Sequence, residues 1–190
     1  MLRLEEILGR EVLSTDAKLV GTVEGIGLDT QEWKVGALKV SVAKGVEPIL
    51  NVRKPMFGAA RAAFPTEKVE SVRDVIKMKE PLNKLAVFII DHTQIPVNAS
   101  DLINRRVVSS KGSELGVNES MFIEPEAGWK IPFLELDVDR EAFRDMKLKK
   151  GAFKGREVKL PTSLVQTVGD MIMLNTHGED LARILQHTPR

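Results

Sequence analysis

The stretch "FPTEKVESVRDVIKMK" (residues 64–79) decides the fold, because the chain contains it twice. Its counterpart "LPTSLVQTVGDMIMLN" (160–175) follows ninety-six positions later. A proline, a threonine, three apolar positions and an aspartate recur at the same spacing in both stretches. A segment that recurs in register over this distance indicates an internal duplication, and the search for repeats precedes every other inference about the fold.

The match extends through most of both halves of the chain. "ILGREVLSTDAKLVGTVE" (7–24) aligns with residues 102–119, and after one inserted residue "WKVGALKVSV" (33–42) aligns with residues 129–138. Each copy is about 80–90 residues long, far longer than one unit of a solenoid, so two similar domains are expected. The predicted organisation is a first domain at 1–80, a linker or crossing strand at 81–97, and a second domain with a C-terminal helix at 98–190.

Each copy has the pattern of a mainly β domain. Short alternating segments such as 35–42 are separated by turn signals, and glycines inside a strand pattern suggest bulges or tight bends. Pro65 and Pro161 lack a backbone donor and are expected to end a ladder, while Asp74 and Asp170 are expected in the turn before the last strand. The pattern predicts two small antiparallel β-barrels in tandem, with short helical segments.

Two segments of the first copy, "GREVLSTDAKLVGTVEGIGLD" (9–29) and "FPTEKVESVRDVI" (64–76), resemble the PRC-barrel family, and the resemblance covers roughly 2–79 and 98–175. Known PRC-barrels are docking modules of the photosynthetic reaction centre, of a bacterial ribosome-maturation factor and of archaeal cell-division proteins. Tandem copies without an attached domain look most like the archaeal division group. The resemblance implies a non-enzymatic adaptor or scaffold that self-associates as a dimer or polymer and binds a division adaptor, SepF.

Residues able to support catalysis or hold a metal are scarce. The chain has no cysteine and three histidines, His92, His177 and His187, none at matching positions of the two copies and none with the spacing of metal ligands. No phosphate-binding glycine motif and no nucleophile motif is present. We therefore expect no enzyme activity, no catalytic or metal-binding residues and no cofactor.

An apolar, alanine-rich stretch, "KGVEPILNVRKPMFGAARAAF" (44–64), and the run "LAVFII" (85–90) supply the candidate partner interface. If exposed, such residues would mark a binding surface; if buried, the first stretch is a core turn of helix. "LAVFII" is interpreted as a strand of the first domain or as a strand that crosses between domains. The candidate interface residues are Met56, Phe57, Phe88, Ile89 and Ile90.

The most uneven charge lies in residues 139–159, where eight basic and four acidic residues give a net charge of +4. Three interpretations stay open: a solvated loop or short helix, a surface for an acidic protein, and an RNA-binding patch. The last motivates the alternative function, an RNA-binding or ribosome-maturation accessory protein. The candidate basic patch is Arg144, Lys147, Lys149, Lys150, Lys154 and Arg156.

The overall composition is that of an ordinary globular protein. Of its residues 43% are hydrophobic and 29% charged, and the net charge of +1 gives no global attraction to nucleic acid or acidic lipid. No apolar run approaches the length needed to cross about 30 Å of bilayer. A cytoplasmic location without membrane insertion is expected, with recruitment to the division site.

The tail "HGEDLARILQHTPR" (177–190) has helical spacing and is expected to pack on the second domain or bind a partner.

Overall fold

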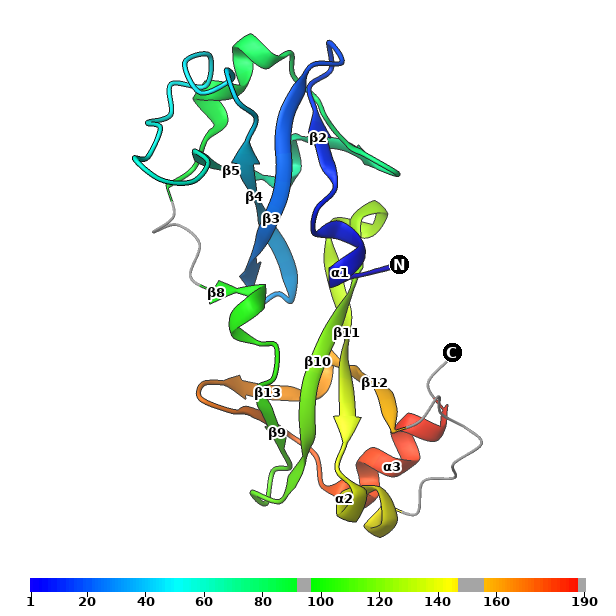
Figure 1. Ribbon diagram of the computed structural model, residues 1–190. Helices are drawn as coiled ribbons and strands as arrows, with labels where there is room; N and C mark the ends of the chain where they lie inside the picture. Colours follow the sequence, from blue (N-terminus) through cyan, green and yellow to red (C-terminus); the bar gives the residue numbers. More distant parts are fainter. Residues whose placement is uncertain (92–96, 147–155, 188–190) are drawn as a thin grey trace. The chain divides into compact units, whose positions relative to one another are not determined.

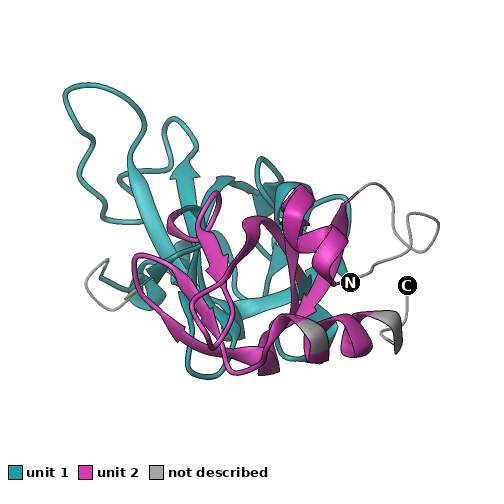
Figure 2. Cartoon of the chain, turned by 90° about the horizontal axis from the view of Figure 1, so that it is seen from below, with its two compact units in different colours: residues 1–100, 123–130 teal, residues 101–122, 131–190 magenta. Residues whose placement is uncertain are grey.

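A computed structural model describes residues 1–91, 97–146 and 156–187. The chain divides into two compact units, which are coloured separately in Figure 2. Unit 1 comprises Met1–Ser100 and Ile123–Lys130, and unit 2 comprises Asp101–Phe122 and Ile131–Arg190. The domain boundaries given above stay a prediction, and residues 92–96 of the predicted linker lie outside the described residues.

The elements of the first copy are short strands with helical turns between them (Figure 1). In chain order they are β1 (Leu2–Arg3), α1 (Leu4–Ile7), β2 (Glu11–Leu13), β3 (Leu19–Asp29), β4 (Lys34–Val42), β5 (Arg61–Pro65), the 3-10 helix η1 (Thr66–Lys68), β6 (Val69–Val72), β7 (Ile76–Met78), the 3-10 helix η2 (Leu82–Phe88) and β8 (Val97–Asn98).

The second copy repeats the six strands β2–β7 in the same order, as β9–β14, and contains two α-helices of its own. Its elements are the 3-10 helix η4 (Ala99–Asp101), β9 (Arg106–Val108), β10 (Glu114–Glu124), the 3-10 helix η5 (Pro125–Ala127), β11 (Lys130–Val138), α2 (Arg140–Asp145), β12 (Glu157–Pro161), the 3-10 helix η6 (Thr162–Leu164), β13 (Val165–Val168), β14 (Ile172–Leu174) and α3 (Gly178–His187).

The protein is mainly β, but its sheet is mixed rather than antiparallel, which corrects the prediction. In the first copy the strand order is β5-β4-β3-β2-β7-β6, and β2 pairs with β7 in parallel, with Val12 opposite Ile76. In the second copy β9 pairs with β14 in parallel, with Val107 opposite Ile172. Parallel neighbours need a long connection, and the strands between them along the chain provide it. Within the described residues β5 and β6 are not hydrogen-bonded to each other, so the sheet is curled and partly open.

In each copy a buried threonine hydrogen-bonds to the equivalent strand, β4 in the first and β11 in the second. Thr66 Oγ1 donates a hydrogen bond to the carbonyl oxygen of Val35 at 2.9 Å, and Thr162 Oγ1 donates to that of Ile131 at 2.8 Å. Both threonines are buried, so each satisfies a carbonyl that water does not reach. Each follows the proline that ends β5 or β12, as predicted, and begins a 3-10 turn. The duplication therefore includes individual hydrogen bonds.

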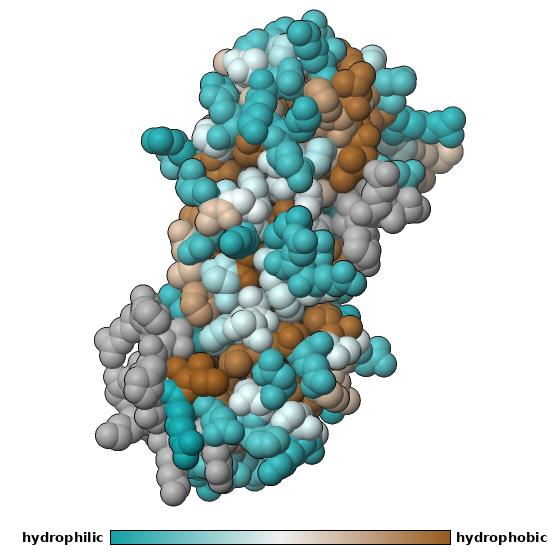
Figure 3. All heavy atoms as spheres, turned by 180° about the vertical axis from the view of Figure 1, so that it is seen from behind, coloured by the Kyte–Doolittle hydropathy of each residue, from teal (hydrophilic) through white to brown (hydrophobic). Residues whose placement is uncertain are grey.

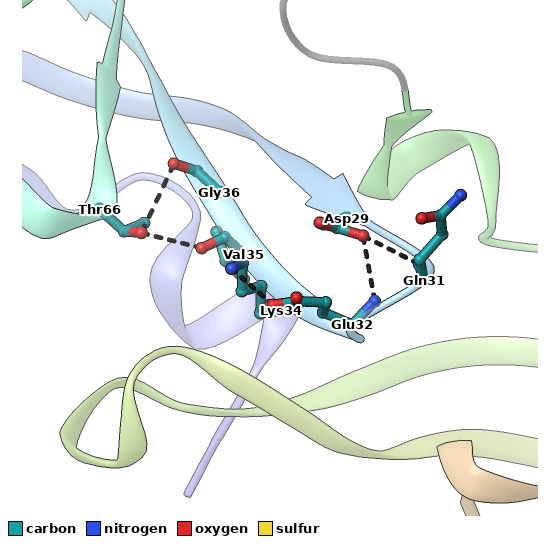
Figure 4. A network of polar contacts seen from close by, with 7 residues as sticks. All are labelled: Asp29, Gln31, Glu32, Lys34, Val35, Gly36 and Thr66. Carbon is teal, nitrogen blue, oxygen red and sulfur yellow. Dashed lines mark hydrogen bonds and ion pairs between the residues drawn. The ribbon is translucent and has the colours of Figure 1, made fainter.

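The turn between β3 and β4 is formed by an aspartate that accepts bonds from the backbone after it (Figure 4). Asp29 Oδ1 accepts the N–H groups of Gln31 at 2.9 Å and Glu32 at 3.1 Å, the local bonding expected of aspartate in a turn. Lys34 Nζ donates to Glu32 Oε2 at 2.7 Å, and this hydrogen bond and the charge of Glu32 raise the pKa of Lys34. The hairpin is thus set by local side chains.

The first four residues of the "LAVFII" run lie in the 3-10 helix η2, and Ile89 and Ile90 follow it outside any strand, which corrects that interpretation. Leu82 and Leu85 are buried, at the three-residue spacing of a 3-10 helix. The start of η2 is fixed by Asp16, whose Oδ1 accepts the N–H of Leu82 at 3.0 Å and the hydroxyl of Ser14 at 2.6 Å. Hydrogen bonds from Ser14 and Leu82, together with the bond to Lys18, lower the pKa of Asp16.

The C-terminal helix α3 (Gly178–His187) packs on its own unit, as predicted. Leu181 and Leu185 are buried, and the helix lies against α2 and β12. The two copies of the predicted aspartate turn are also confirmed, since Asp74 lies between β6 and β7 and Asp170 between β13 and β14. Within the part of the chain that the structure describes, no helix is both long and apolar enough to span a membrane.

Candidate functional site

A long connection between β4 and β5 carries the most exposed large apolar side chains among the described residues. It runs from residue 43 to residue 60 and is drawn in cyan in Figure 1, where it extends away from the two strands. The base is firmly held, because Val42 donates its N–H to the carbonyl of Ala60 at 2.8 Å. Loops longer than about 12–15 residues without regular structure are uncommon and are usually functional.

The first half of this connection is ordered by one helical turn. Leu50 donates its N–H to the carbonyl of Val46 at 3.1 Å, and its side chain is fully buried. Asn51 then adopts a left-handed backbone (φ 54°), and Val52 bonds back to the carbonyl of Glu47 at 3.0 Å. These bonds form a helix C-terminal cap of the Schellman type, in which asparagine is tolerated. Leu50 therefore fixes the point from which the chain leaves the body of the unit.

Glu47 is the only acidic residue of the loop, and its carboxylate is directed to the backbone. It is buried, and its Oε2 accepts the N–H of Gly45 at 2.6 Å. Its own backbone N–H lowers the pKa of the Glu47 carboxyl most, burial opposes this, and the bond from Gly45 and the charges of Lys54 and Lys44 lower it further. The negative charge of Glu47 therefore interacts with groups of the loop itself.

Residues 53–59, which we call the loop tip, lie outside this ordered turn. The exposed fraction of the side chain is 90% for Met56 and 87% for Phe57. Arg53 and Lys54 precede them and are also exposed, and Gly58 takes a positive φ of 85°. Within the described residues, the loop tip makes no hydrogen bond. Two large apolar groups are thus held in water beside two cations.

The other three predicted interface residues lie elsewhere, in and after η2, and are half-buried. The Phe88 ring packs under the ammonium of Lys68, with Nζ 3.7 Å from the ring centroid. Ile90 donates its N–H to the carbonyl of Ala63 at 2.9 Å, beside strand β5, and Ile89 is half-buried. The interface role of Phe88, Ile89 and Ile90 stays a prediction, and in the structure these residues also pack within the unit.

Several exposed apolar residues were not predicted, and two of them lie on η2 and on the loop. Val87 is 80% exposed on η2, and Ile49 is 46% exposed on the ordered turn of the loop. The signal for Val87 was available, because a three-residue spacing that buries positions 82 and 85 directs 87 outward. On the face seen in Figure 3, apolar surface forms several patches separated by hydrophilic side chains. The loop tip differs from such patches because its apolar side chains stand almost fully in water.

The predicted basic patch is described only at its ends. Lys147, Lys149, Lys150 and Lys154 lie outside the described residues. Arg144 is exposed on helix α2, four residues after exposed Arg140. Arg156 is exposed and forms an ion pair with Asp137, with Nη2 and Oδ2 3.2 Å apart. Arg140 and Arg144 share one face of the helix, since residues four apart are neighbours on its surface.

The described residues hold no group of three or more histidine, cysteine, aspartate or glutamate side chains that could bind a metal. His177 lies beside Ser110, with Nδ1 and Oγ 2.5 Å apart, and both residues are exposed. Among the described residues no carboxylate hydrogen-bonds to this ring. His92 lies outside the described residues.

Comparison with family models assigns a family to the first copy only. Residues 1–82 match the family model described as the PRC-barrel domain, and the second half is not matched. No curated protein matches the sequence. A solved structure that carries the name 16S ribosomal RNA processing protein RimM, from Pseudomonas aeruginosa, is similar at 14% identity and covers 83% of this chain and 98% of its own. Its TM-score of 0.30 is too low to support an argument about fold or function.

Proposed function

We propose that this chain, whose residues 1–82 are a PRC-barrel domain, is a non-catalytic module that binds another protein through its loop tip. The observation that carries the proposal is the exposure of Met56 and Phe57, at 90% and 87%. A monomeric protein gains nothing by holding two large apolar side chains in water at the end of a long loop. The second copy repeats the strand order of the first, so the proposed protein is a tandem of two PRC-type units.

The composition of the loop tip supports a protein partner. Protein interfaces are enriched in aromatic residues, methionine and arginine, and depleted in lysine, glutamate and aspartate. Arg53, Met56 and Phe57 belong to the enriched classes, whereas Lys54 and Ala59 belong to classes that are depleted at interfaces. Burying a methionine or phenylalanine side chain contributes about 1.5–3 kcal/mol each, so both together would supply about 3–6 kcal/mol towards binding.

The proposal is tested by removing the apolar groups of the loop tip. The variant Met56→Ser/Phe57→Ser is expected to fold as the wild type does, because exposed substitutions change stability by no more than about 0.5 kcal/mol. Tagged wild-type and variant chains are used as baits in cells, and bound proteins are quantified by mass spectrometry. The matched control is Val87→Ser, which removes an 80% exposed apolar group from η2.

A protein bound by the wild type and by Val87→Ser, but lost from the double variant, is the expected result. Equal binding by all three baits would contradict docking at the loop tip. Self-association belongs to the same proposal, and sedimentation equilibrium measures it. A dimer or polymer that becomes monomeric only in the double variant would identify a second copy of the chain as the partner.

The process served by this docking is a separate matter. The sequence resemblance suggests archaeal cell division, with a division adaptor as the partner. Neither the family match nor the solved structure supports that process. The proposal is therefore limited to protein docking and names no pathway.

A ribosome-maturation or RNA-binding role is the second candidate, and exposed Arg140 and Arg144 on one face of α2 favour it. Among the described residues neither arginine forms an ion pair. Each phosphate contact adds about one unit to the slope of log affinity against log salt. Arg140→Ala/Arg144→Ala is thus expected to lower that slope by about two for a structured RNA. An unchanged slope, or no RNA binding by the wild type, would count against this role.

A further inference from the structure

We infer that the loop tip binds an acidic segment of its partner, one in which aspartate or glutamate flanks an apolar side chain. This inference rests on the proposed docking function and adds the chemistry of the partner. Lys44, Arg53 and Lys54 form the cationic part of the site, and Met56 and Phe57 form the apolar part.

The three cations of the loop outnumber its single carboxylate, that of Glu47, whose pKa the charges of Lys54 and Lys44 lower. Lys44, Arg53 and Lys54 are exposed, and none makes an ion pair with the residues that the structure describes. Glu47, the only acid between residues 43 and 60, is buried and bonded to the backbone N–H of Gly45. The loop that carries Met56 and Phe57 therefore exposes three cations and no acidic side chain.

The base of the loop shows the contrasting case. Arg61, the first residue of β5, pairs with Glu24 on β3, with Nε and Oε1 2.8 Å apart. Among the described residues, the cation that lies on the sheet thus has an ion-pair partner, whereas Glu47, the one carboxylate of the loop, acts on Lys54 and Lys44 by its charge without forming an ion pair with either. Arginine forms paired, charge-assisted hydrogen bonds with carboxylates, so Arg53 supplies directional recognition and Lys54 supplies charge.

An acidic protein segment fits these groups better than a lipid surface or a nucleic acid. A single acyl chain gives only marginal membrane binding, and two side chains bury less apolar area than that chain does. Single-stranded nucleic acid is bound by several aromatic side chains on which successive bases stack, and the loop tip has one, Phe57. A protein segment can supply both a pocket for Phe57 and carboxylates for Arg53.

The test is a selection of peptides from a random library of about 12 residues per peptide, long enough to span an interface patch. The full-length chain is immobilised, and Met56→Ser/Phe57→Ser serves for counter-selection. Enriched peptides are synthesised with a fluorophore, and their dissociation constants are measured by anisotropy. Arg53→Ala/Lys54→Ala is compared with Arg73→Ala/Lys84→Ala, which removes the same charge from exposed positions outside the loop.

We expect the enriched peptides to be acidic and to contain an apolar residue. The loop variant Arg53→Ala/Lys54→Ala should weaken their binding at least about tenfold, and the control variant should change it less than about twofold. Enriched peptides that are neutral or basic would overturn the acidic inference while protein docking stood. No loop-dependent enrichment would overturn docking itself.

Two further probes assign the other possible occupants. Vesicles of phosphatidylcholine with about 30% phosphatidylserine test a lipid surface, and a single-stranded RNA of about 20 nucleotides tests a nucleic acid. Binding of either probe that is lost in Met56→Ser/Phe57→Ser would assign the loop tip to that class and overturn the inference. Binding that the double variant retains would place the contact away from the loop tip and leave the inference intact.

Discussion

Thr66→Val tests whether the repeated threonine stabilises each copy as the hydrogen bonds imply. Valine has almost the same shape as threonine, so the substitution removes the hydroxyl and leaves the packing volume unchanged. The bond that is lost joins Thr66 Oγ1 to the buried carbonyl of Val35 at 2.9 Å. Thr162→Val removes the equivalent bond to Ile131, at 2.8 Å.

The expected loss of stability follows from the burial of both partners. Thr66 is 5% exposed and Thr162 is 7% exposed, so neither carbonyl gains water when the hydroxyl is removed. A net hydrogen bond contributes about 0.5–1.5 kcal/mol, and a buried group left unsatisfied costs about 1–3 kcal/mol. Valine offsets part of this because its methyl group is buried. We therefore expect each substitution to lower the free energy of unfolding by about 1–2 kcal/mol.

Urea unfolding followed by circular dichroism at 218 nm, roughly the β-sheet minimum, measures the effect. Exposed Thr22 on β3 and exposed Thr167 on β13 provide the matched controls, and their valine variants should stay within about 0.5 kcal/mol of the wild type. The effects in the two copies should agree within about 0.5 kcal/mol, since the two bonds have the same geometry. A large effect in one copy with none in the other would refute the claim that the two hydrogen bonds are equivalent.

Three more substitutions probe the sheet, the loop and the helix η2. Gly21→Ala places a Cβ against the backbone carbonyl of Ser41 and should lower stability by about 1–3 kcal/mol in the same urea assay, whereas Gly36→Ala, which meets open space, should not. Leu50→Ala removes the buried anchor of the loop and should cost about 2–5 kcal/mol, with faster amide exchange across residues 44–52; an unchanged exchange rate would contradict the anchoring role. Asp16 has a lowered pKa in the folded state, so its charge stabilises the fold above the unfolded pKa of about 3.9, and this contribution is lost as the pH falls through the folded value. Asp16→Asn should therefore be less stable than the wild type at neutral pH, and the difference between them should shrink as the pH falls below about 3.9; a constant difference would show that the charge has no role.

Local chemistry in the sequence predicted the parts of the fold that depend on near neighbours. Pro65 ends its strand because it lacks a donor, and Asp74 lies in the turn before β7. The pairing of β2 with β7 could not be predicted in this way, because the two strands are more than sixty residues apart and periodicity does not specify the partner of a strand.

The η2 segment shows why a short apolar run is ambiguous. A run of six apolar residues fits a buried strand as well as a helical turn, and periodicity alone does not separate them. The deciding group is Asp16, whose side chain caps the N–H of Leu82 from sixty-six positions away. The sequence around residue 82 does not indicate that contact, because Asp16 lies far away along the chain.

The candidate interface stays a prediction, and the sequence alone did not determine which of its residues are exposed. Met56 and Phe57 stood out as apolar residues in a loop, but the sequence left open whether they were buried or exposed. In the structure, buried Leu50 fixes the ordered turn of the loop, and the loop tip with Met56 and Phe57 lies outside that turn and is exposed. Phe88, Ile89 and Ile90 have the same apolar character, and they pack within the unit because η2 and β5 supply neighbours.

Photo-crosslinking at position 57 tests the central claim most directly. Phe57 is replaced by benzoylphenylalanine, which keeps the aromatic ring, and the same probe at position 87 is the control for a side chain that is also highly exposed. After irradiation in cells, the account predicts a discrete protein adduct at position 57 and none at position 87. Adducts of the same pattern at both positions, or none at position 57, would contradict docking through the loop tip.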